Sequence, residues 1–278
     1  MNLAWAMAVV LVATALAVVA LLMVRRWSPH GGHFTDTGRA AGVFGILATS
    51  FAVLLAFMIY LAFTAYANTS AGADTEAELV AQQIETAQLL PPAQRLDLAS
   101  ELVCYGRAVI HQEWPAMAAG NAPAVNPWGV RIFSTFRQVQ PESESEAAAY
   151  SKWLDQTSAR EAARLDRVSA ANGVIPAPLW FMLLISMGVV LAFVFFFADR
   201  GEGAVVQAVQ VGAVTAILVS SLLVVRFLDH PYAPGAGSIR STAMQENLDR
   251  IVLGVDQLGI TLPDLCDANG QPLASTPG

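Results

Sequence analysis

The sequence predicts an all-α integral membrane protein with four transmembrane helices, a helical bundle inserted between the second and third, and a C-terminal amphipathic helix. Three observations predict this fold class. The 278 residues are 55% hydrophobic and only 13% charged, whereas a soluble domain carries about 25% charged residues. The apolar residues gather in four nearly uncharged stretches, each long enough to cross a bilayer. The segment between the second and third stretches is polar and has helical periodicity.

A first transmembrane hairpin is predicted at residues 1–67. Leu3 to Val24 is apolar throughout, and Arg25 and Arg26 follow it rather than precede it. This order favours a membrane helix over a cleaved signal peptide, whose basic residues come first. The polar connector at 27–41 carries two histidines three residues apart, but no cysteine or carboxylate cluster flanks them. No metal site is therefore predicted.

The second span is predicted to continue into water, as one long helix or two stacked helices over Gly42 to Leu90. Its first half is uncharged and its second half is amphipathic. Phe44, Phe51 and Phe57 recur every six or seven residues, and Ser50 is among the few polar groups. This stripe is either packed against lipid and neighbouring helices or part of a pore lining, because apolar constrictions can gate ions by dewetting.

A helical bundle is predicted at residues 68–173. One helix is expected to start at Pro92 and to be ended or kinked at Glu113-Trp114-Pro115, because a proline disfavours the helical conformation at the residue before it. A short amphipathic segment follows, and a strong helix starts after Pro141. Short connections between amphipathic helices are typical of an antiparallel bundle.

A second transmembrane hairpin is predicted at residues 174–227. Its two helices, 174–198 and 204–227, are joined by a turn of five residues. The second helix is the most polar span, and Gln207 and Gln210 are three residues apart on one face. Such groups avoid lipid, so they either bond to a neighbouring helix or face a wet lumen. Both are candidates for a pore lining.

The last segment, residues 228–278, is predicted to hold an amphipathic helix, with a disordered tail after Pro263. Cys104 and Cys266 are the only cysteines of the chain. Two readings remain open for them: a disulfide that ties the tail to the bundle, or two unpaired cysteines buried in helices.

Charge predicts the orientation and the partners. Arg25, Arg26 and Arg39 give the 25–40 loop the strongest basic bias, so this loop is expected to be cytoplasmic and the bundle extracytoplasmic. The net charge of −7 argues against nucleic acid as a partner, since nucleic-acid binding requires clustered bases.

Several short motifs over residues 1–260 resemble the bacterial bestrophin-like membrane family. They are L-P-P-A-Q-R at residues 90–95 with Tyr105, Glu113-Trp114-Pro115, Arg160 and Arg164 with Leu165, Pro178-Leu179-Trp180, and Asp229-His230-Pro231-Tyr232. Bestrophins, the supposed distant relatives of this family, are pentameric anion channels with four spans and a cytoplasmic helical domain. The resemblance therefore implies a four-span fold, a homo-oligomer and a bacterial plasma membrane. The orientation predicted from the basic loop is opposite to that of bestrophins.

The motifs also have a structural interpretation. Trp114 is expected to pack in the bundle, and Glu113 is expected to pair with a base such as Arg160 or Arg164. Arg226 is expected either to extend to the membrane interface or to pair with Asp229, three residues further on. Pro231 is expected to terminate the fourth span.

Two functions are retained. The first is passive conduction of a chloride-like anion by an oligomer. The second is a non-conducting membrane scaffold whose helical domain docks a partner protein, because the interior of the four spans carries no acid or base of the kind a pump requires. No nucleophile or phosphate-binding motif occurs in the sequence, so neither an enzyme nor a cofactor is predicted.

Overall fold

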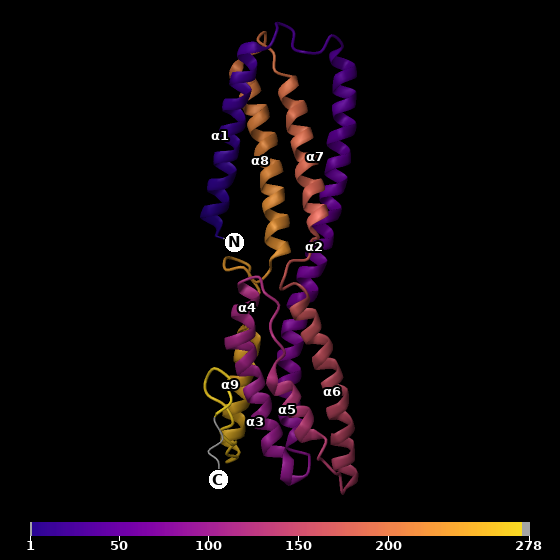
Figure 1. The fold of residues 1–278 in the computed structure, drawn as a ribbon, viewed down its shortest axis with the longest axis vertical. Coiled ribbons are helices and arrows are strands. Elements are labelled where there is room, and N and C mark those ends of the chain that lie inside the picture. Colours follow the sequence, from indigo (N-terminus) through magenta and orange to yellow (C-terminus); the bar gives the residue numbers. More distant parts are fainter. Residues whose placement is uncertain (1, 274–278) are drawn as a thin grey trace. The chain divides into compact units, whose positions relative to one another are not determined.

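The structure is a computed structural model that describes residues 2–273. Within that range its regular elements are helices joined by turns and loops, with one β-bridge between Cys266 and Pro272 (Figure 1). It divides into two compact units. The membrane unit consists of Met1–Ala65, Gly173–Asp229 and Pro234–Gly237. The helical unit consists of Tyr66–Asn172, His230–Ala233 and the described part of Ser238–Gly278.

The four predicted spans are confirmed as helices. They are α1 (Leu3–Trp27), α2 (Thr37–Ala87), α7 (Ala177–Phe196) and α8 (Ala204–Asp229). Each is long and apolar enough to cross a bilayer. With two prolines at 176 and 178, α7 begins where the missing backbone donors are not needed for helical hydrogen bonds.

Close packing between α1 and α8 depends on small residues. On α8 they recur at every fourth position, at Ala204, Ala208, Gly212, Ala216 and Ser220. A Cβ atom added to Gly212 would lie 3.4 Å from the Thr14 side chain of α1. This spacing lets two helix backbones approach closely in lipid, where dispersion contacts drive helix association. Figure 1 shows α1 and α8 side by side.

A single continuous helix of 51 residues, α2, belongs to both units. The alternative of two stacked helices is therefore excluded. In the helical unit, Gly72 permits the closest approach of α2 to α6 (Glu144–Ser169), because a Cβ atom there would lie 2.7 Å from the Asp166 Cβ.

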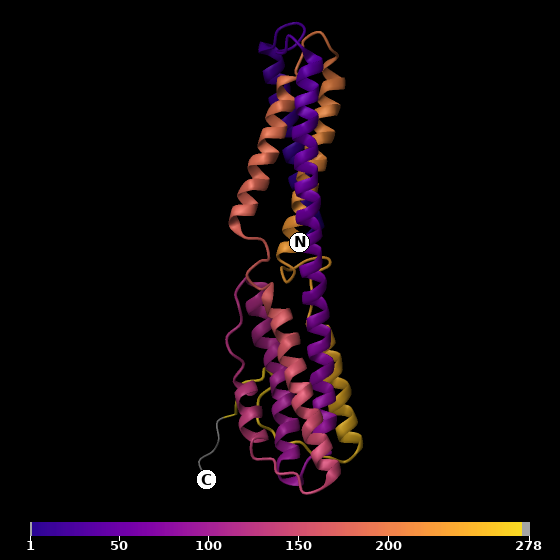
Figure 2. The same ribbon diagram turned by 90° about the vertical axis from the view of Figure 1, so that its right-hand side faces the viewer.

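The helical unit packs α2 and α6 with four further helices (Figure 2). These are α3 (Pro92–Ala108), α4 (Trp114–Ala118), α5 (Pro127–Phe136) and α9 (Thr242–Gln257). Between α3 and α4 lies a π-helical turn, η1 (Val109–Glu113). The helical path does not end at Pro115, because α4 follows η1 directly and Pro115 lies in the first turn of α4, where its missing donor is tolerated.

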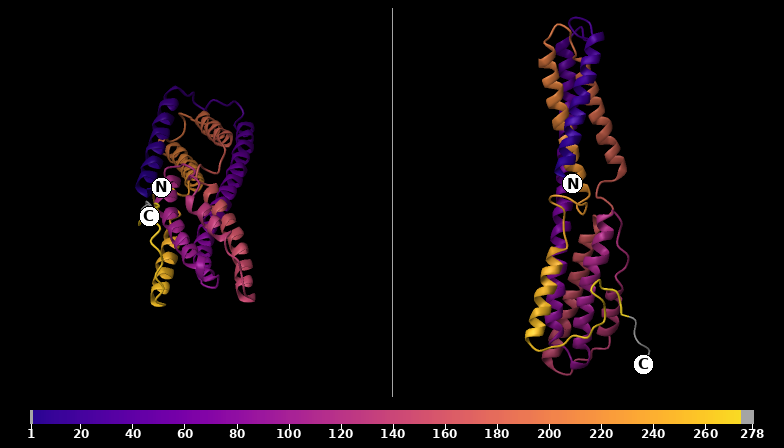
Figure 3. Two further views of the ribbon diagram at one scale, coloured as in Figure 1. Left: turned by 60° about the horizontal axis from the view of Figure 1, so that its bottom comes forward. Right: turned by 90° about the vertical axis from the view of Figure 1, so that its left-hand side faces the viewer.

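The prediction of a disordered tail after Pro263 is wrong for the residues up to Leu273. A segment from Gly259 to Leu273, here called the strap, folds over α3 (Figure 3). A disulfide joins Cys104 to Cys266, whose Cα atoms are 5.8 Å apart. The Trp128 indole donates a hydrogen bond of 2.7 Å to the Gly270 carbonyl. The disulfide and single hydrogen bonds hold the strap in place. Because the strap has no periodic pattern of apolar residues, its sequence looks like that of a loop. Residues 274–278 lie outside the described residues.

Candidate functional site

The phenylalanines proposed for a pore lining fall into different environments. Phe51 is buried among α7 and α8 side chains of the membrane unit. Phe44 is half-buried, and its ring centroid lies 6.2 Å from that of Phe193 and 5.8 Å from that of Phe197. Phe57, in contrast, is 57% exposed. Of these three phenylalanines, Phe57 has the side chain most available to a second copy, to lipid or to a pore.

Ser50 and Phe57 belong to one exposed face of α2, here called the α2 stripe. Its members, spaced alternately by four and three residues, are Ile46, Ser50, Val53, Phe57, Tyr60 and Thr64. None of them is charged. The Thr64 hydroxyl donates to the Tyr60 carbonyl at 2.9 Å, so this hydroxyl is satisfied without a neighbouring helix.

Gln207 and Gln210 do not share an environment. The Gln207 side chain is buried and donates to the Asp199 carbonyl at 3.0 Å and to the Glu202 carboxylate at 3.2 Å. It therefore holds the turn between α7 and α8. Gln210 is exposed. The two residues differ because Gln207 is in the first turn of α8, where its amide reaches back to the connecting turn. A pore-lining role for either residue stays a prediction.

Asp229, the last residue of α8, caps the entrance of α7. One carboxylate oxygen accepts hydrogen bonds from the Val174 and Ile175 amides at 2.8 and 2.7 Å. The other accepts from the Trp180 indole at 3.0 Å and lies 3.8 Å from Arg226. A buried carboxylate satisfied by amide and indole donors is a strong local tie between two spans. The Asp229 motif and the Trp180 motif are thus in direct contact.

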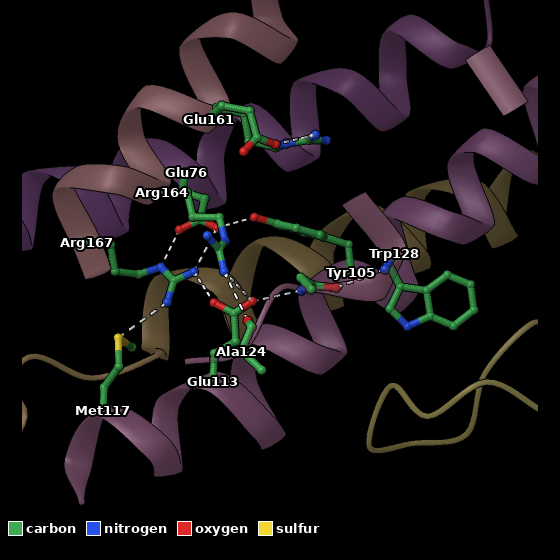
Figure 4. A network of polar contacts seen from close by, with 11 residues as sticks. Glu76, Tyr105, Glu113, Met117, Ala124, Trp128, Glu161, Arg164 and Arg167 are labelled. Carbon is green, nitrogen blue, oxygen red and sulfur yellow. Dashed lines mark hydrogen bonds and ion pairs between the residues drawn. The ribbon is translucent and has the colours of Figure 1, made fainter. Parts of the chain in front are cut away.

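Buried charges meet at the centre of the helical unit, as Figure 4 shows. Arg167 of α6 has no exposed side-chain area and forms ion pairs with two carboxylates. It bonds to Glu76 of α2 through two nitrogen atoms and to Glu113 of η1 at 2.7 Å. The Tyr105 hydroxyl of α3 donates to Glu76 at 2.5 Å. Four elements are thereby joined through one guanidinium and two carboxylates.

Further donors complete the cluster around Glu113. The Arg164 guanidinium lies 3.3 Å from its carboxylate, and the Asn126 amide donates to it at 3.0 Å. The expected pairing of Glu113 with Arg164 is thus present, whereas Arg160 instead bonds to Gln83 at 2.8 Å and to Glu161 at 3.1 Å.

Sequence reasoning missed Arg167, the central base. Arg160, Arg164 and Arg167 are spaced by four and three residues, so they lie along one face of α6. Buried Trp153 and Ala163 lie on the same helix. A row of bases along the core-facing side of an amphipathic helix was the signal available in the sequence.

The electrostatics follow from burial and charge balance. Burial, with Glu76 close by, holds the pKa of Tyr105 well above its usual value. Burial alone would lower the pKa of Arg167, but the two carboxylates outweigh it and the pKa is raised. Burial likewise raises the pKa of Tyr232. Arg167 and Tyr105 therefore keep their protons, and their contacts join α2, α3, α6 and η1.

Two motifs far apart in the sequence meet beside this cluster. The Trp114 indole donates to the Ile239 carbonyl at 3.3 Å, and its ring meets Tyr232 edge-on with centroids 5.7 Å apart. The Tyr232 hydroxyl donates to the Arg167 carbonyl. The expectation that Trp114 packs in the bundle fits this placement. Pro231 follows the end of α8 by two residues.

In the described part of the chain, no three His, Cys, Asp or Glu side chains are arranged to hold a metal ion. The buried carboxylates instead face arginines.

Comparison with known proteins gives a consistent match. A family model described as Bestrophin-like domain matches residues 11–244. A bacterial bestrophin homologue from Klebsiella pneumoniae, solved as a substitution variant, superposes with a TM-score of 0.66 at 14% identity over 89% of this chain and 97% of the other. A structure described as a membrane protein superposes with a TM-score of 0.68 at 14% identity over 91% of this chain and 99% of the other. No curated protein matches the chain.

Proposed function

Because the chain belongs to the Bestrophin-like domain family, we propose that it forms a homo-oligomeric channel that conducts chloride-like anions passively. The solved relatives share its fold at low identity, so they support the four-span arrangement rather than the activity. The anion specificity comes from the resemblance to bestrophins. One feature of this chain carries the proposal, namely the α2 stripe.

The α2 stripe suits a pore because it is uncharged and exposed. Phe57 presents a phenyl ring, whose edge is partially positive and can face an anion. Ser50 and Tyr60 add hydroxyl groups within the same face. A constriction lined by such residues passes ions without binding them tightly. One chain cannot enclose a lumen with a single helix face, so several copies must bring their stripes together.

The orientation proposed for the channel places the helical unit outside a bacterial plasma membrane. The basic residues Arg25, Arg26 and Arg39 favour a cytoplasmic position for the connector between α1 and α2. A disulfide between Cys104 and Cys266 favours an oxidising compartment for the helical unit. The two arguments are independent of each other and agree.

Planar-bilayer recording of the purified protein tests conduction. With a chloride gradient and an impermeant cation, we expect unitary currents that reverse near the chloride potential. The Phe57→Ala variant should change the unitary conductance. Phe181→Ala serves as a matched control, because Phe181 of α7 is 67% exposed outside the α2 stripe. Silence from well-folded oligomers would overturn the channel proposal.

Such silence would favour the second candidate, a membrane scaffold whose helical unit docks a partner protein. Its supporting observation is the exposed apolar surface of the helical unit, where Val125 and Phe133 are 80% and 61% exposed. Affinity capture of the intact protein should then recover a reproducible partner. Failure to recover one would remove the support for this candidate.

A further inference from the structure

A hollow of about 210 Å³ lies between α3, α9 and the strap, beside the disulfide. Cys104 and Cys266 both line it, together with Val103 of α3 and Val252 of α9. The two cysteines are only 2% and 4% exposed, so little of either faces open solvent. The hollow is therefore the approach by which a small reagent can reach the disulfide in the folded protein.

A cation lies beside the sulfur atom of the strap. The Nη1 atom of Arg107, on α3, is 3.7 Å from the Cys266 Sγ atom and 3.4 Å from the Asp267 carbonyl oxygen. A neighbouring cation stabilises a thiolate, and the sulfur that forms the more stable thiolate leaves faster in thiol–disulfide exchange. Cys266 is therefore the better leaving group, and Cys104 is the sulfur that a reductant attacks.

The charge of the hollow restricts the reductant. The carboxylates of Asp256 and Asp264 line the hollow together with the Arg107 guanidinium. This excess of acid repels an anionic reagent. A thiol that carries no other charge therefore enters more readily than one that carries a carboxylate or a sulfonate.

We propose that the Cys104–Cys266 disulfide is a reducible latch, opened in the folded protein by a dithiol that carries no other charge. One thiolate of the dithiol attacks the Cys104 sulfur, which forms a mixed disulfide and releases Cys266 as a thiolate beside Arg107. The second thiol of the reagent then attacks the reagent's own sulfur and releases Cys104. The dithiol is oxidised to a disulfide, and the two electrons and two protons that it loses are taken up by the two cysteines.

The strap that this reaction frees also holds η1. The Gln112 amide of η1 donates to the Asn269 carbonyl at 2.9 Å. Gly270 lies against the end of α3, where an added Cβ atom would clash with the Ala108 backbone. η1 also carries Glu113 of the buried charge cluster. Opening the latch therefore loosens the π-helical turn that supplies one carboxylate of this cluster.

Reduction kinetics of the intact protein in detergent test the direct route. Dithiothreitol is the probe, and the fraction of reduced protein is measured by alkylation and mass spectrometry. We expect the rate to be proportional to the dithiothreitol concentration and to change less than twofold in 1 M urea. A reaction that requires unfolding would instead accelerate about fivefold or more, because urea raises the population of the unfolded chain. Such an acceleration, or no reduction at all, would overturn the proposal.

The role of Arg107 is tested by Arg107→Gln. We expect this variant to be reduced about threefold more slowly, because the departing Cys266 thiolate loses its cation. A purely structural role predicts the opposite sign, since loss of the bond to Asp267 loosens the strap. Arg250→Gln is the matched control, because Arg250 is exposed on α9 and does not line the hollow. A faster reaction in Arg107→Gln, or equal rates in both variants, would contradict the assigned role.

Monothiols test the site of attack and the charge of the reagent. After acid quenching, mass spectrometry should place the mixed disulfide of 2-mercaptoethanol on Cys104, and an adduct on Cys266 would overturn the assigned direction. The anionic 2-mercaptoethanesulfonate should react several times more slowly, and an equal rate would overturn the charge selectivity.

Hydrogen exchange tests the link between the latch and η1. The amides of residues 109–113 should exchange faster in the reduced protein than in the oxidised protein. Unchanged exchange there would show that opening the latch does not reach the buried cluster, and this part of the proposal would be wrong.

Discussion

Arg167 balances the buried charge of the helical unit, and its removal should be the most damaging single change there. The Arg167→Ala variant leaves Glu76 and Glu113 buried without their shared cation. Breaking a buried ion pair costs about 3–5 kcal/mol, which lowers Tm by about 6–20 °C for a chain of this size. Thermal unfolding in detergent measures this. Arg137→Ala, at an exposed position, should leave Tm within about 2 °C, because such substitutions change stability by less than about 0.5 kcal/mol. Equal shifts in both variants would contradict the assigned role of Arg167.

Tyr105 and Tyr232 should make the stability of the helical unit sensitive to alkaline pH. Both have pKa values raised by burial above the ordinary 10.0. Above pH 10 the unfolded chain releases these two protons while the folded chain keeps them, so the free energy of unfolding falls as the pH rises. Tm measured between pH 8 and pH 11 should decline, and Tyr105→Phe should have a shallower decline. If Tm declined with pH as steeply in Tyr105→Phe as in the wild-type protein, Tyr105 would not contribute to the pH dependence of stability.

The approach of α2 to α6 depends on one glycine. In Gly72→Ala, the new methyl group would lie 2.8 Å from the Ala163 carbonyl as well as close to Asp166, so the helices must separate. We expect a loss of about 1–3 kcal/mol from overpacking, although alanine gains about 1 kcal/mol of helix propensity over glycine. Gly45→Ala in the same helix meets no atom within 4 Å and should be neutral or stabilising. Comparing the Tm values of the two variants tests this prediction, and a Gly72→Ala variant as stable as Gly45→Ala would contradict it.

Detaching the strap should lower the stability of the whole helical unit. The disulfide closes a loop between residues separated by 162 positions, and the chain-entropy model assigns such a closure about 5 kcal/mol. Reduction, or Cys266→Ser, should lower Tm and increase proteolysis between Gly259 and Leu273. A reductant that leaves Tm unchanged would show that the Trp128 and Ser100 contacts hold the strap without the covalent link.

The sequence predicted some elements well for a definite physical reason. An uncharged run of twenty residues has few alternatives to a membrane helix, so α1, α7 and α8 were found within a few residues of their ends. The strap was missed because its order comes from anchors distant in sequence. Gln207 and Gln210 were assigned one role from their spacing, whereas the turn before α8 draws only Gln207 inward. Helical periodicity shows which residues share one face of a helix. Which other element packs against that face depends on the tertiary fold.

At the scale of the whole molecule, the acidic charge of the helical unit should affect how chloride reaches a pore. The helical unit of this acidic chain carries more acids than bases. An acidic surface on the path of an anion reduces the local anion concentration, and salt screens this effect. Single-channel chloride conductance should therefore rise more than proportionally between about 0.05 and 0.5 M salt, where the Debye length shrinks from about 14 to 4 Å. A strictly proportional rise would place the helical unit away from the ion path.

Cysteine labelling determines the orientation. We expect Ala148→Cys, exposed on α6, to react with a membrane-impermeant maleimide in intact spheroplasts. Thr35→Cys, exposed in the connector before α2, should react only after lysis. The native cysteines are joined to each other and do not compete for the reagent. The reverse pattern would place the disulfide in a reducing compartment, where it would not persist. The helical unit would then be cytoplasmic, and the basic connector would be an exception to the charge rule.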